Sequence, residues 1–476
     1  MIGSLRETGR GPLAKAAFAL AAFAVLAAAI LGRPEKRLND FDQSFYLTIA
    51  YDMTRHGVFS GGVFDRTDST RAAPPPGMFF VPGYPALVAA AMWLDPRFDR
   101  AVACHVLANE GHRSLEGCEF YARPIHLAHA ALLAGAALAI AATAQLLFGG
   151  LGVFLLAGTL ATAGFAVEAD LFSFVMTESL GVALFSFAAL ALVRTLRTGR
   201  GRDAALTGAL LGLLILSRPS FQALLVLYPL ALAIGLRWLA PPRRPAAVIL
   251  AAVVAFLVGA AVVVGPWVAR NAVVIGKAGL SAEYGSAAII ERLAYNDMTL
   301  QEGLLAGPYC LPGVGPALVS RLAGPDAMAR FEWDHPGSFF QTGRASRDAL
   351  VKANTRLDPV MGEVLRAEYE KHGLRHLLTT IPLAWCGLWV AQWWGLLLVP
   401  VFLAACCLAF RRAPLFLAYA VPALAMVGLH AAVANHYPRY NLMLIGPVAA
   451  GTAWLLTMLW TAARYRRTAT GAKQAS

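Results

Sequence analysis

Two carboxylates lie close together early in the chain, in the polar run Asn39-Asp40-Phe41-Asp42-Gln43-Ser44. A carboxylate at the mouth of a site can accept a proton from a substrate hydroxyl and so act as a general base. Helix capping is the alternative, with Asp40 as the N-cap and Gln43 completing a capping box. Asp42 would then lie in the first turn, where the helix dipole favours an anion. Capping accounts well for Asp40 and only partly for Asp42, so both are candidate bases.

The elements that must position these residues are long apolar runs. The chain has 476 residues, of which 58% are hydrophobic and 14% charged. This balance is typical of a helical membrane protein, in which a span needs ~20 apolar residues. The first run is too long for a signal peptide and lacks a cleavage site. We therefore expect an all-α polytopic membrane protein with about ten spans, near 13–31, 125–148, 151–167, 179–194, 204–217, 220–238, 246–267, 386–410, 413–434 and 441–462. Two of these runs, 151–167 and 204–217, are short.

The net charge of +12 reflects membrane topology rather than nucleic-acid binding. With the N-terminus inside and the spans alternating, the short inner loops collect basic residues, as the positive-inside rule requires. Among the acids, only Glu7 and Asp203 share that side. We expect a cell inner membrane protein with both termini in the cytoplasm and an external, periplasmic active site. The cytoplasmic basic residues are then Arg6, Arg10, Lys15, Arg194, Arg197, Arg200, Arg202, Arg237, Arg243, Arg244, Arg411, Arg412, Arg464, Arg466, Arg467 and Lys473.

Two long external segments interrupt the spans, and loops of this length are usually functional or independently folded. They divide the chain into an N-terminal bundle (1–267) with a first external loop (32–124), an external segment (268–375) and C-terminal helices with a basic tail (376–476).

The first external loop contains two predicted helices. Phe41, Phe45, Ile49 and Met53 recur every four residues, which predicts an amphipathic helix over about 41–56 on the outer interface. A short apolar helix over about 84–94 follows and does not cross, because a crossing would invert every later loop. In the second segment, apolar spacing predicts one or two amphipathic helices around Pro359, then a membrane-edge helix after Gly373.

The cysteines divide by compartment. Cys104, Cys118 and Cys310 lie outside, where disulfides are permitted, and Cys104–Cys118 is the plausible pair, although sequence alone does not prove the connectivity. Cys386, Cys406 and Cys407 lie in or near spans and are interpreted as small apolar fillers. His105 and His112 lie near the first pair, but their spacing matches no zinc template, and no metal ligand set is clear.

Further polar residues gather at the outer membrane edge. Taken singly, each is explained by a snorkelling charge or a helix cap. Together, three arginines and several acids on one face could form a polar cavity for an anionic lipid headgroup, because the guanidinium fork suits phosphate. The residues in question are Glu168, Asp170, Glu178, Arg218, Arg270, Asn271, Arg439 and Tyr440.

The order of these motifs resembles that of GT-C glycosyltransferases, in the group that contains the protein O-mannosyltransferases and the lipid A aminoarabinose transferase. The resemblance covers nearly the whole membrane portion, and no motif is familiar over about 280–340. The motifs that carry it are Asp42-Gln43-Ser44-Phe45-Tyr46, Gly57, Pro82-Gly83-Tyr84-Pro85, Phe148-Gly149, Thr177-Glu178-Ser179-Leu180, Ser217-Arg218-Pro219, Pro266-Trp267, Arg270-Asn271 and His436-Tyr437-Pro438-Arg439-Tyr440.

The resemblance implies a GT-C-like bundle that moves a hexosyl or pentosyl group from a polyprenyl-phosphate donor to a hydroxyl of a lipid, glycan or protein. It places the general base at Asp42, with Asp40 as the rival, and implies inversion at the anomeric carbon. Many relatives carry a second acid directly after the first Asp, where this chain has Gln43. That departure puts a metal-binding role in doubt, although Glu168 and Asp170 could supply ligands. The cofactor is therefore unknown.

The remaining roles follow from charge. A leaving lipid phosphate needs positive partners, for which Arg270 and Arg439 are the first candidates and Arg218 the third. Tyr440 could donate to the phosphate or line the sugar pocket. The acids expected in that pocket are Glu178, Glu168 and Asp170.

A transporter or flippase of a lipid-linked sugar is the alternative. Such proteins place ionisable groups near the membrane midplane, often in repeated halves. Here the interiors of the spans carry almost no charge and no half-repeat is visible, which favours the transferase.

Overall fold

The computed structural model describes residues 10–38, 42–62, 73–110, 115–354, 356–434 and 437–474. Within these ranges the protein is helical and has no β-strand, apart from one isolated bridge between Ser60 and Pro76. The all-α membrane fold expected from the apolar runs is confirmed.

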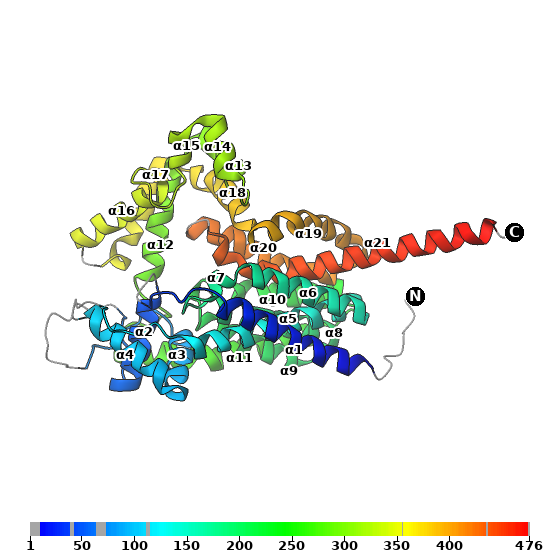
Figure 1. Ribbon diagram of the computed structural model, residues 1–476, viewed down its shortest axis with the longest axis horizontal. Coiled ribbons are helices and arrows are strands. Elements are labelled where there is room, and N and C mark those ends of the chain that lie inside the picture. The colour runs from blue at the N-terminus through cyan, green and yellow to red at the C-terminus, as the bar shows by residue number, and fades with distance from the viewer. Residues whose placement is uncertain are drawn as a thin grey trace.

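The ten apolar runs are helical, and together they form one elongated bundle (Figure 1). The eighth span begins at Gln392 rather than near 386, because Cys386 still belongs to the preceding helix. Eight of the helices are long and apolar enough to cross a membrane. The other two, α6 and α9, have 17 and 15 residues, which at 1.5 Å per residue is shorter than a ~30 Å hydrocarbon core. The bundle consists of α1 (Arg10–Leu31), α5 (Arg123–Phe148), α6 (Leu151–Val167), α8 (Glu178–Thr198), α9 (Gly201–Ile215), η1 (Pro219–Ala223) with α10 (Leu224–Ile234) and η2 (Gly235–Leu239), α11 (Ala246–Val274), α19 (Gln392–Arg412), α20 (Leu415–Val433), and η5 (Pro438–Leu444) with α21 (Ile445–Gln474).

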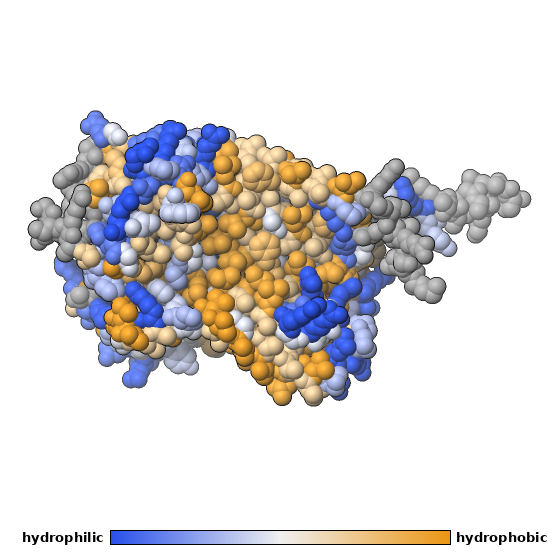
Figure 2. All heavy atoms as spheres, turned by 90° about the horizontal axis from the view of Figure 1, so that it is seen from below, coloured by the Kyte–Doolittle hydropathy of each residue, from blue (hydrophilic) through white to orange (hydrophobic). Residues whose placement is uncertain are grey.

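The two ends of the bundle differ. The start of α1 and the end of α21 lie at one end, and the helices of the first external loop and α12 lie at the other (Figure 1). Figure 2 shows a broad apolar belt across the middle of the molecule, with hydrophilic residues gathered towards both ends. This is the surface that a bilayer requires of a spanning protein.

The first external loop folds into three helices at the end of the bundle opposite the start of α1. They are α2 (Gln43–His56), α3 (Gly83–Leu94) and α4 (Pro96–Glu110). The expected amphipathic helix is therefore present, and it ends at Gly57, whose φ of 66° is a left-handed conformation that suits glycine. The three helices share an apolar core in which Tyr84, Val88 and Phe98 are fully buried.

The second external segment begins later than expected. Helix α11 continues through Pro266 to Val274, because a proline inside a membrane helix is tolerated where neighbouring groups satisfy the backbone. The segment then folds as short helices, and the helices expected around Pro359 and after Gly373 are present. They are α12 (Tyr284–Leu293), η3 (Ala294–Asp297), α13 (Leu300–Tyr309), α14 (Gly315–Ala323), α15 (Pro325–Ala329), α16 (Phe339–Asn354), η4 (Asp358–Val360), α17 (Met361–His372) and α18 (Arg375–Leu388).

The cysteine interpretation needs one correction. Cys104 is bonded to Cys118, with a Cα–Cα distance of 5.6 Å. Cys386 is not an apolar filler, because it is bonded to Cys310 across 76 residues of sequence. The second bond ties the end of α13 to α18, while Cys406 and Cys407 carry free thiols.

Helices α9 and α11 pack through glycines at the closest approach in the bundle. A Cβ atom on Gly208 would lie 1.9 Å from the carbonyl oxygen of Phe256, and one on Gly259 would lie 2.1 Å from that of Ala205. Small residues at such positions let helix backbones meet within a membrane. This packing holds the short helix α9, whose C-terminal end leads to Arg218.

We predict that Gly259→Ala destabilises the protein by about 1–3 kcal/mol, because the added methyl group forces α9 and α11 apart. Thermal unfolding in detergent measures the effect. Gly265→Ala is the matched control, because it lies on the same helix and no atom lies within 4 Å of its Cβ position. Equal melting temperatures for the two variants would contradict the proposed close contact.

Candidate functional site

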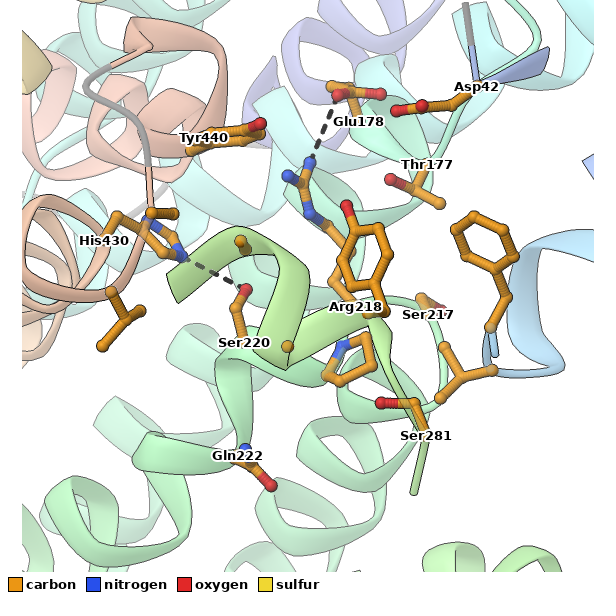
Figure 3. A pocket seen from close by; sticks show the side chains of 18 of the residues that line it. Asp42, Thr177, Glu178, Ser217, Arg218, Ser220, Gln222, Ser281, His430 and Tyr440 are labelled. Carbon is orange, nitrogen blue, oxygen red and sulfur yellow. Dashed lines mark hydrogen bonds and ion pairs between the residues drawn. The ribbon is translucent and has the colours of Figure 1, made fainter. Parts of the chain in front are cut away.

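A cavity of about 390 Å³ lies at the end of the bundle that carries the first external loop. Its walls come from that loop, the starts of α8 and η1, the second external segment and the α20–η5 turn. Figure 3 shows its polar side chains converging from these elements. The charged and hydroxyl-bearing residues that line it are Asp42, Tyr46, Thr177, Glu178, Ser217, Arg218, Ser220, Ser281, Tyr284, Arg439 and Tyr440.

Asp42 lines the cavity and is not used as a helix cap. It occupies the N-cap position of α2, yet its side chain accepts no capping hydrogen bond. The helix begins at Gln43, so Asp42 rather than Asp40 occupies the N-cap position. Asp40 itself lies outside the described residues.

Gln43 connects the first loop to the start of α8. Its side chain is fully buried; Nε2 donates to the carbonyl oxygen of Arg37 at 3.0 Å, and Oε1 accepts from the backbone N–H of Val175 at 2.7 Å. Asp42 is therefore held beside the backbone that leads into Glu178.

Two histidines of α5 bond to the backbone of the turn that precedes α8. His126 Nε2 donates to the carbonyl oxygen of Ser173 at 2.8 Å, and His129 Nδ1 donates to that of Phe172 at 2.9 Å. His129 Nε2 in turn accepts from the hydroxyl of Tyr84 at 2.9 Å. The turn before α8 is thus held by buried side chains of α2 and α5, which positions Glu178 without any flexible connection.

Glu178 and Arg218 form a buried ion pair. Their closest atoms, Oε1 and Nη1, are 3.5 Å apart, and the carboxylate side chain is only 6% exposed. Glu178 occupies the first turn of α8, where the helix dipole also stabilises a negative charge. The Arg218 stem lies over Gly181, one turn further along, where a Cβ atom would come within 3.0 Å of its Cδ. The second oxygen, Oε2, is buried and has no hydrogen-bond partner among the described residues.

Arg439 lies on the opposite wall and faces Asp42. Its Nη2 atom is 3.8 Å from Oδ2 of Asp42, which is electrostatic contact without a direct hydrogen bond. The ring of Tyr440 lies under both guanidinium groups, with centroid distances of 5.7 Å to Arg218 and 5.2 Å to Arg439. The cavity therefore pairs two carboxylates with two arginines.

The surroundings raise the pKa of Asp42. Burial is the largest cause, because it disfavours the charged carboxylate, and the negative charge of Glu178 acts in the same direction. Arg439 and Arg218 oppose the shift. A carboxylate with a raised pKa is a stronger base than an ordinary aspartate.

A third polar group borders the cavity next to these charges. The ring of His430 contacts Oδ1 of Asn441 through Nδ1 at 2.8 Å and Oγ of Ser220 through Nε2 at 3.1 Å. Asn441 donates from Nδ2 to the carbonyl oxygen of Gly387, so its Oδ1 must accept from the histidine. Nε2 therefore accepts the Ser220 proton, and Ser220 presents only lone pairs to the cavity (Figure 3).

Glu168 and Asp170 do not line the cavity, which corrects their expected place in the substrate pocket. Glu168 accepts a hydrogen bond from the backbone N–H of Ala391, and burial raises its pKa. Ala391 has a left-handed φ of 55° just before α19. Asp170 pairs with Lys36 at 2.7 Å and is 55% exposed. Both acids have structural partners away from the site. Within the described ranges, no group of three or more His, Cys, Asp or Glu side chains is arranged to hold a metal ion.

Arg270 also lies outside the cavity. Its guanidinium donates to the carbonyl oxygens of Gly77 at 2.7 Å and Phe59 at 3.1 Å, and it lies over the ring of Trp267 at 5.0 Å. Arg270 is therefore not among the residues that line this cavity. Arg270 instead clamps two segments of the first loop that flank its Ser60–Pro76 bridge.

One wall of the cavity was not predicted from the sequence. Ser281, Tyr284 and Ile289 come from the start of the second external segment, where the residue pattern has no clear period. Tyr284 packs against Phe80 of the first loop with ring centroids 5.3 Å apart. A run of aromatics and small residues in an external segment was the available signal, but it does not specify what they contact.

Comparison with known proteins adds two solved structures. No family model and no curated protein matches the chain. The chain is similar to the archaeal oligosaccharyltransferase AglB from Archaeoglobus fulgidus in complex with an inhibitory peptide and a dolichol-phosphate, with 10% identity, 98% of this chain and 52% of that chain covered, and a TM-score of 0.49. It is also similar to a crystal structure of the Archaeoglobus fulgidus oligosaccharyltransferase with Zn and sulfate, with 11% identity, coverages of 94% and 50%, and a TM-score of 0.48. The chain spans about half the length of each.

We predict that Arg270→Ala loosens the first loop. The N–H of Gly77 bonds to the carbonyl oxygen of Phe59, and the clamp supports this pair. Amide hydrogen exchange around Gly77 should accelerate at least about tenfold, because a hydrogen bond from a charged donor contributes roughly 1.5–3 kcal/mol. Arg439→Ala is the control and should leave this exchange unchanged. Exchange at the wild-type rate in Arg270→Ala would rule out the clamp.

Proposed function

We propose that the protein is a glycosyltransferase of the GT-C type, which moves a sugar from a polyprenyl-phosphate donor to an acceptor hydroxyl. The observation that carries the proposal is the uncapped Asp42 carboxylate, held in a cavity at the membrane boundary beside Glu178 and opposite two arginines. Such a cavity offers a base and an anion site within one space.

Asp42 is the general base in this mechanism. Its raised pKa suits proton abstraction from the acceptor hydroxyl, and its oxygen atoms are free of capping hydrogen bonds. As the proton moves to Asp42, the acceptor oxygen attacks the anomeric carbon and the bond from that carbon to the lipid phosphate breaks. Attack opposite the leaving group inverts the configuration.

Arg439 and Arg218 stabilise the departing phosphate. Their ion-pair distances to Asp42 and Glu178 are 3.8 and 3.5 Å, longer than the ~2.8 Å of a direct charge-assisted hydrogen bond. Both guanidinium groups can therefore turn towards a phosphate without first breaking a tight bond. Tyr440 lies between them and can donate its hydroxyl to a phosphate oxygen.

Glu178 binds the sugar itself. One of its oxygens faces Arg218, and the other is buried without a partner. A buried carboxylate oxygen left unpaired costs about 1–3 kcal/mol or more. A sugar hydroxyl that donates to this oxygen would remove the penalty, and Ser220 offers a second acceptor on the cavity wall.

The rest of the cavity suits a lipid chain. Phe79, Val81, Ile289, Leu429 and Val433 line its apolar side. A polyprenyl tail can lie against this side while its phosphate reaches the arginines. The acceptor in this proposal is a hydroxyl of a lipid, glycan or protein.

The cavity lies on the external side in this proposal, at a cell inner membrane, with both termini in the cytoplasm. Disulfides form in oxidising compartments, and both disulfides belong to the same end of the bundle as the cavity. The basic inner loops lead to the same orientation.

We predict that Asp42→Asn abolishes transfer, with a loss of about 10²–10⁴-fold, because the amide cannot accept the proton. The substrate is found by mass spectrometry of lipids, glycans and proteins from a deletion strain, as one missing glycosyl group. A wild-type copy should restore that group and the Asp42→Asn copy should not, although both accumulate in the membrane.

Asp170→Asn is the matched control, because Asp170 pairs with Lys36 on the surface outside the cavity, and this copy should restore the group. Full restoration by Asp42→Asn would exclude Asp42 as the base. A deletion strain that lacks no glycosyl group but accumulates a lipid-linked sugar on the inner side would instead favour a flippase.

We predict that the acid limb of the rate profile lies above the ordinary aspartate value of 3.8, because burial raises the pKa of Asp42. The carboxylate is protonated, and therefore inactive, below its pKa. Arg439 lowers this pKa, so Arg439→Gln should move the limb to still higher pH. The measurement is the transfer rate against pH with the identified donor, and a limb that moves to lower pH in this variant would contradict the assignment.

A further inference from the structure

Helix α18 of the second external segment has its polar face inward and its apolar face outward. The exposed residues are Leu374, Leu377, Leu378 and Ile381, each 63–70% exposed. They follow the 3–4-residue spacing of a helical stripe. A helix on a water-exposed domain normally buries this stripe, so another apolar phase must cover it here.

The polar face of α18 is held inward by Arg292, which is fully buried. Its Nη2 atom donates to the hydroxyls of Thr379 and Thr380, both at 3.1 Å, and its Nε atom donates to the carbonyl oxygen of Ala431 at 2.6 Å. A buried guanidinium needs such partners, and they fix the rotation of α18 about its axis. The outward stripe is therefore a determined feature of the fold.

Helix α13 is attached to α18, and α14 packs against α13. The Cys310–Cys386 disulfide joins the end of α13 to α18, and Trp385 Nε1 donates to the carbonyl oxygen of Gly307 at 3.0 Å. This hairpin also exposes large apolar side chains. They are Leu300 (82%), Leu304 (70%), Val314 (54%), Leu318 (37%) and Leu322 (66%).

This apolar surface, formed by the exposed residues of α13, α14 and α18, is continuous with the membrane-spanning part. Helix α18 runs through a short turn at Trp389 into the candidate membrane span α19, whose Trp393 and Leu397 are 56% and 62% exposed. In Figure 1, α18 and α13 lie beside the bundle above α20, whereas α12, α16 and α17 extend beyond its end.

We propose that the surface of α13, α14 and α18 is embedded in the outer leaflet, where lipid acyl chains cover its leucines. An amphipathic element at an interface buries its apolar face into the boundary between headgroups and acyl chains. The second external segment is then a membrane-attached body rather than a domain in the aqueous phase. This surface is separate from the cavity, and the proposal does not depend on the transferase reaction.

The test uses an environment-sensitive fluorophore on single cysteines in the full-length protein in lipid nanodiscs. The free thiols Cys406 and Cys407 are first removed by Cys406→Ala and Cys407→Ala, while the two disulfides stay closed without reductant. The labelled positions are Leu304→Cys and Leu322→Cys. Lys352→Cys is the control, because Lys352 is an exposed residue of α16, away from this surface.

Phosphatidylcholine with a nitroxide near its headgroup should quench roughly half of the fluorescence at positions 304 and 322, because the proposed depth lies within the reach of that nitroxide. A blue-shifted emission should accompany the quenching, and position 352 should show neither effect. Equal quenching at all three positions would overturn the proposal. The proposal would also be overturned if positions 304 and 322 were not quenched and each disc held two copies of the protein, because a second chain would then cover the surface. If a leucine variant does not accumulate, Val314→Cys probes the same face.

Discussion

The site depends on one buried side chain, the amide of Gln43. It donates to one backbone carbonyl of the first loop and accepts from one backbone amide of the turn before α8. Both ends of the amide are satisfied, and in a dry environment the loss of either bond would leave a buried polar group at a cost of about 1–3 kcal/mol. This double contact brings Asp42 and Glu178, 136 positions apart in sequence, to the same cavity. A glutamine has both a donor and an acceptor, and an acid at this position would not satisfy the carbonyl of Arg37 when ionised.

The two carboxylates and two arginines of the cavity balance in charge, but no direct hydrogen bond joins either pair. Burial and the neighbouring charge of Glu178 raise the pKa of Asp42, and the two arginines oppose this shift without direct hydrogen bonds. An anionic ligand would compete with the carboxylates for the same guanidinium groups. When Arg439 turns towards such a ligand, Asp42 loses part of the attraction that lowers its pKa and becomes a stronger base. In a transferase, this competition would couple occupation of the phosphate site to activation of the acceptor.

The sequence predicted the membrane part well because a span is specified locally, by composition and length. All ten apolar runs are helices, and the amphipathic helix after Asp42 lies where its four-residue spacing placed it. Roles that depend on distant partners were not predictable. Arg270 and Arg439 both lie near the end of a predicted span, but one bonds to carbonyls of the first loop and the other faces the cavity. Cys386 was interpreted as an apolar filler because of its apolar neighbours in sequence, but its disulfide partner lies 76 positions away. The inner wall around Tyr284 was missed for the same reason.

The second external segment has one face of polar and aromatic residues and another of exposed leucines, and Arg292 lies between them. On one side, Ser281 and Tyr284 complete the cavity, where polar and aromatic groups must meet those of the first loop. On the other side, α13, α14 and α18 present leucines to their surroundings. A buried arginine with five hydrogen-bonded partners fixes α12 to α18 and to the end of α20 between these faces. Because Arg292 joins α12, which carries the cavity wall, to α18, which carries part of the apolar surface, a displacement of α18 would also displace a wall of the cavity. In the proposed embedding, the depth of the segment in the outer leaflet is therefore coupled to the shape of the cavity.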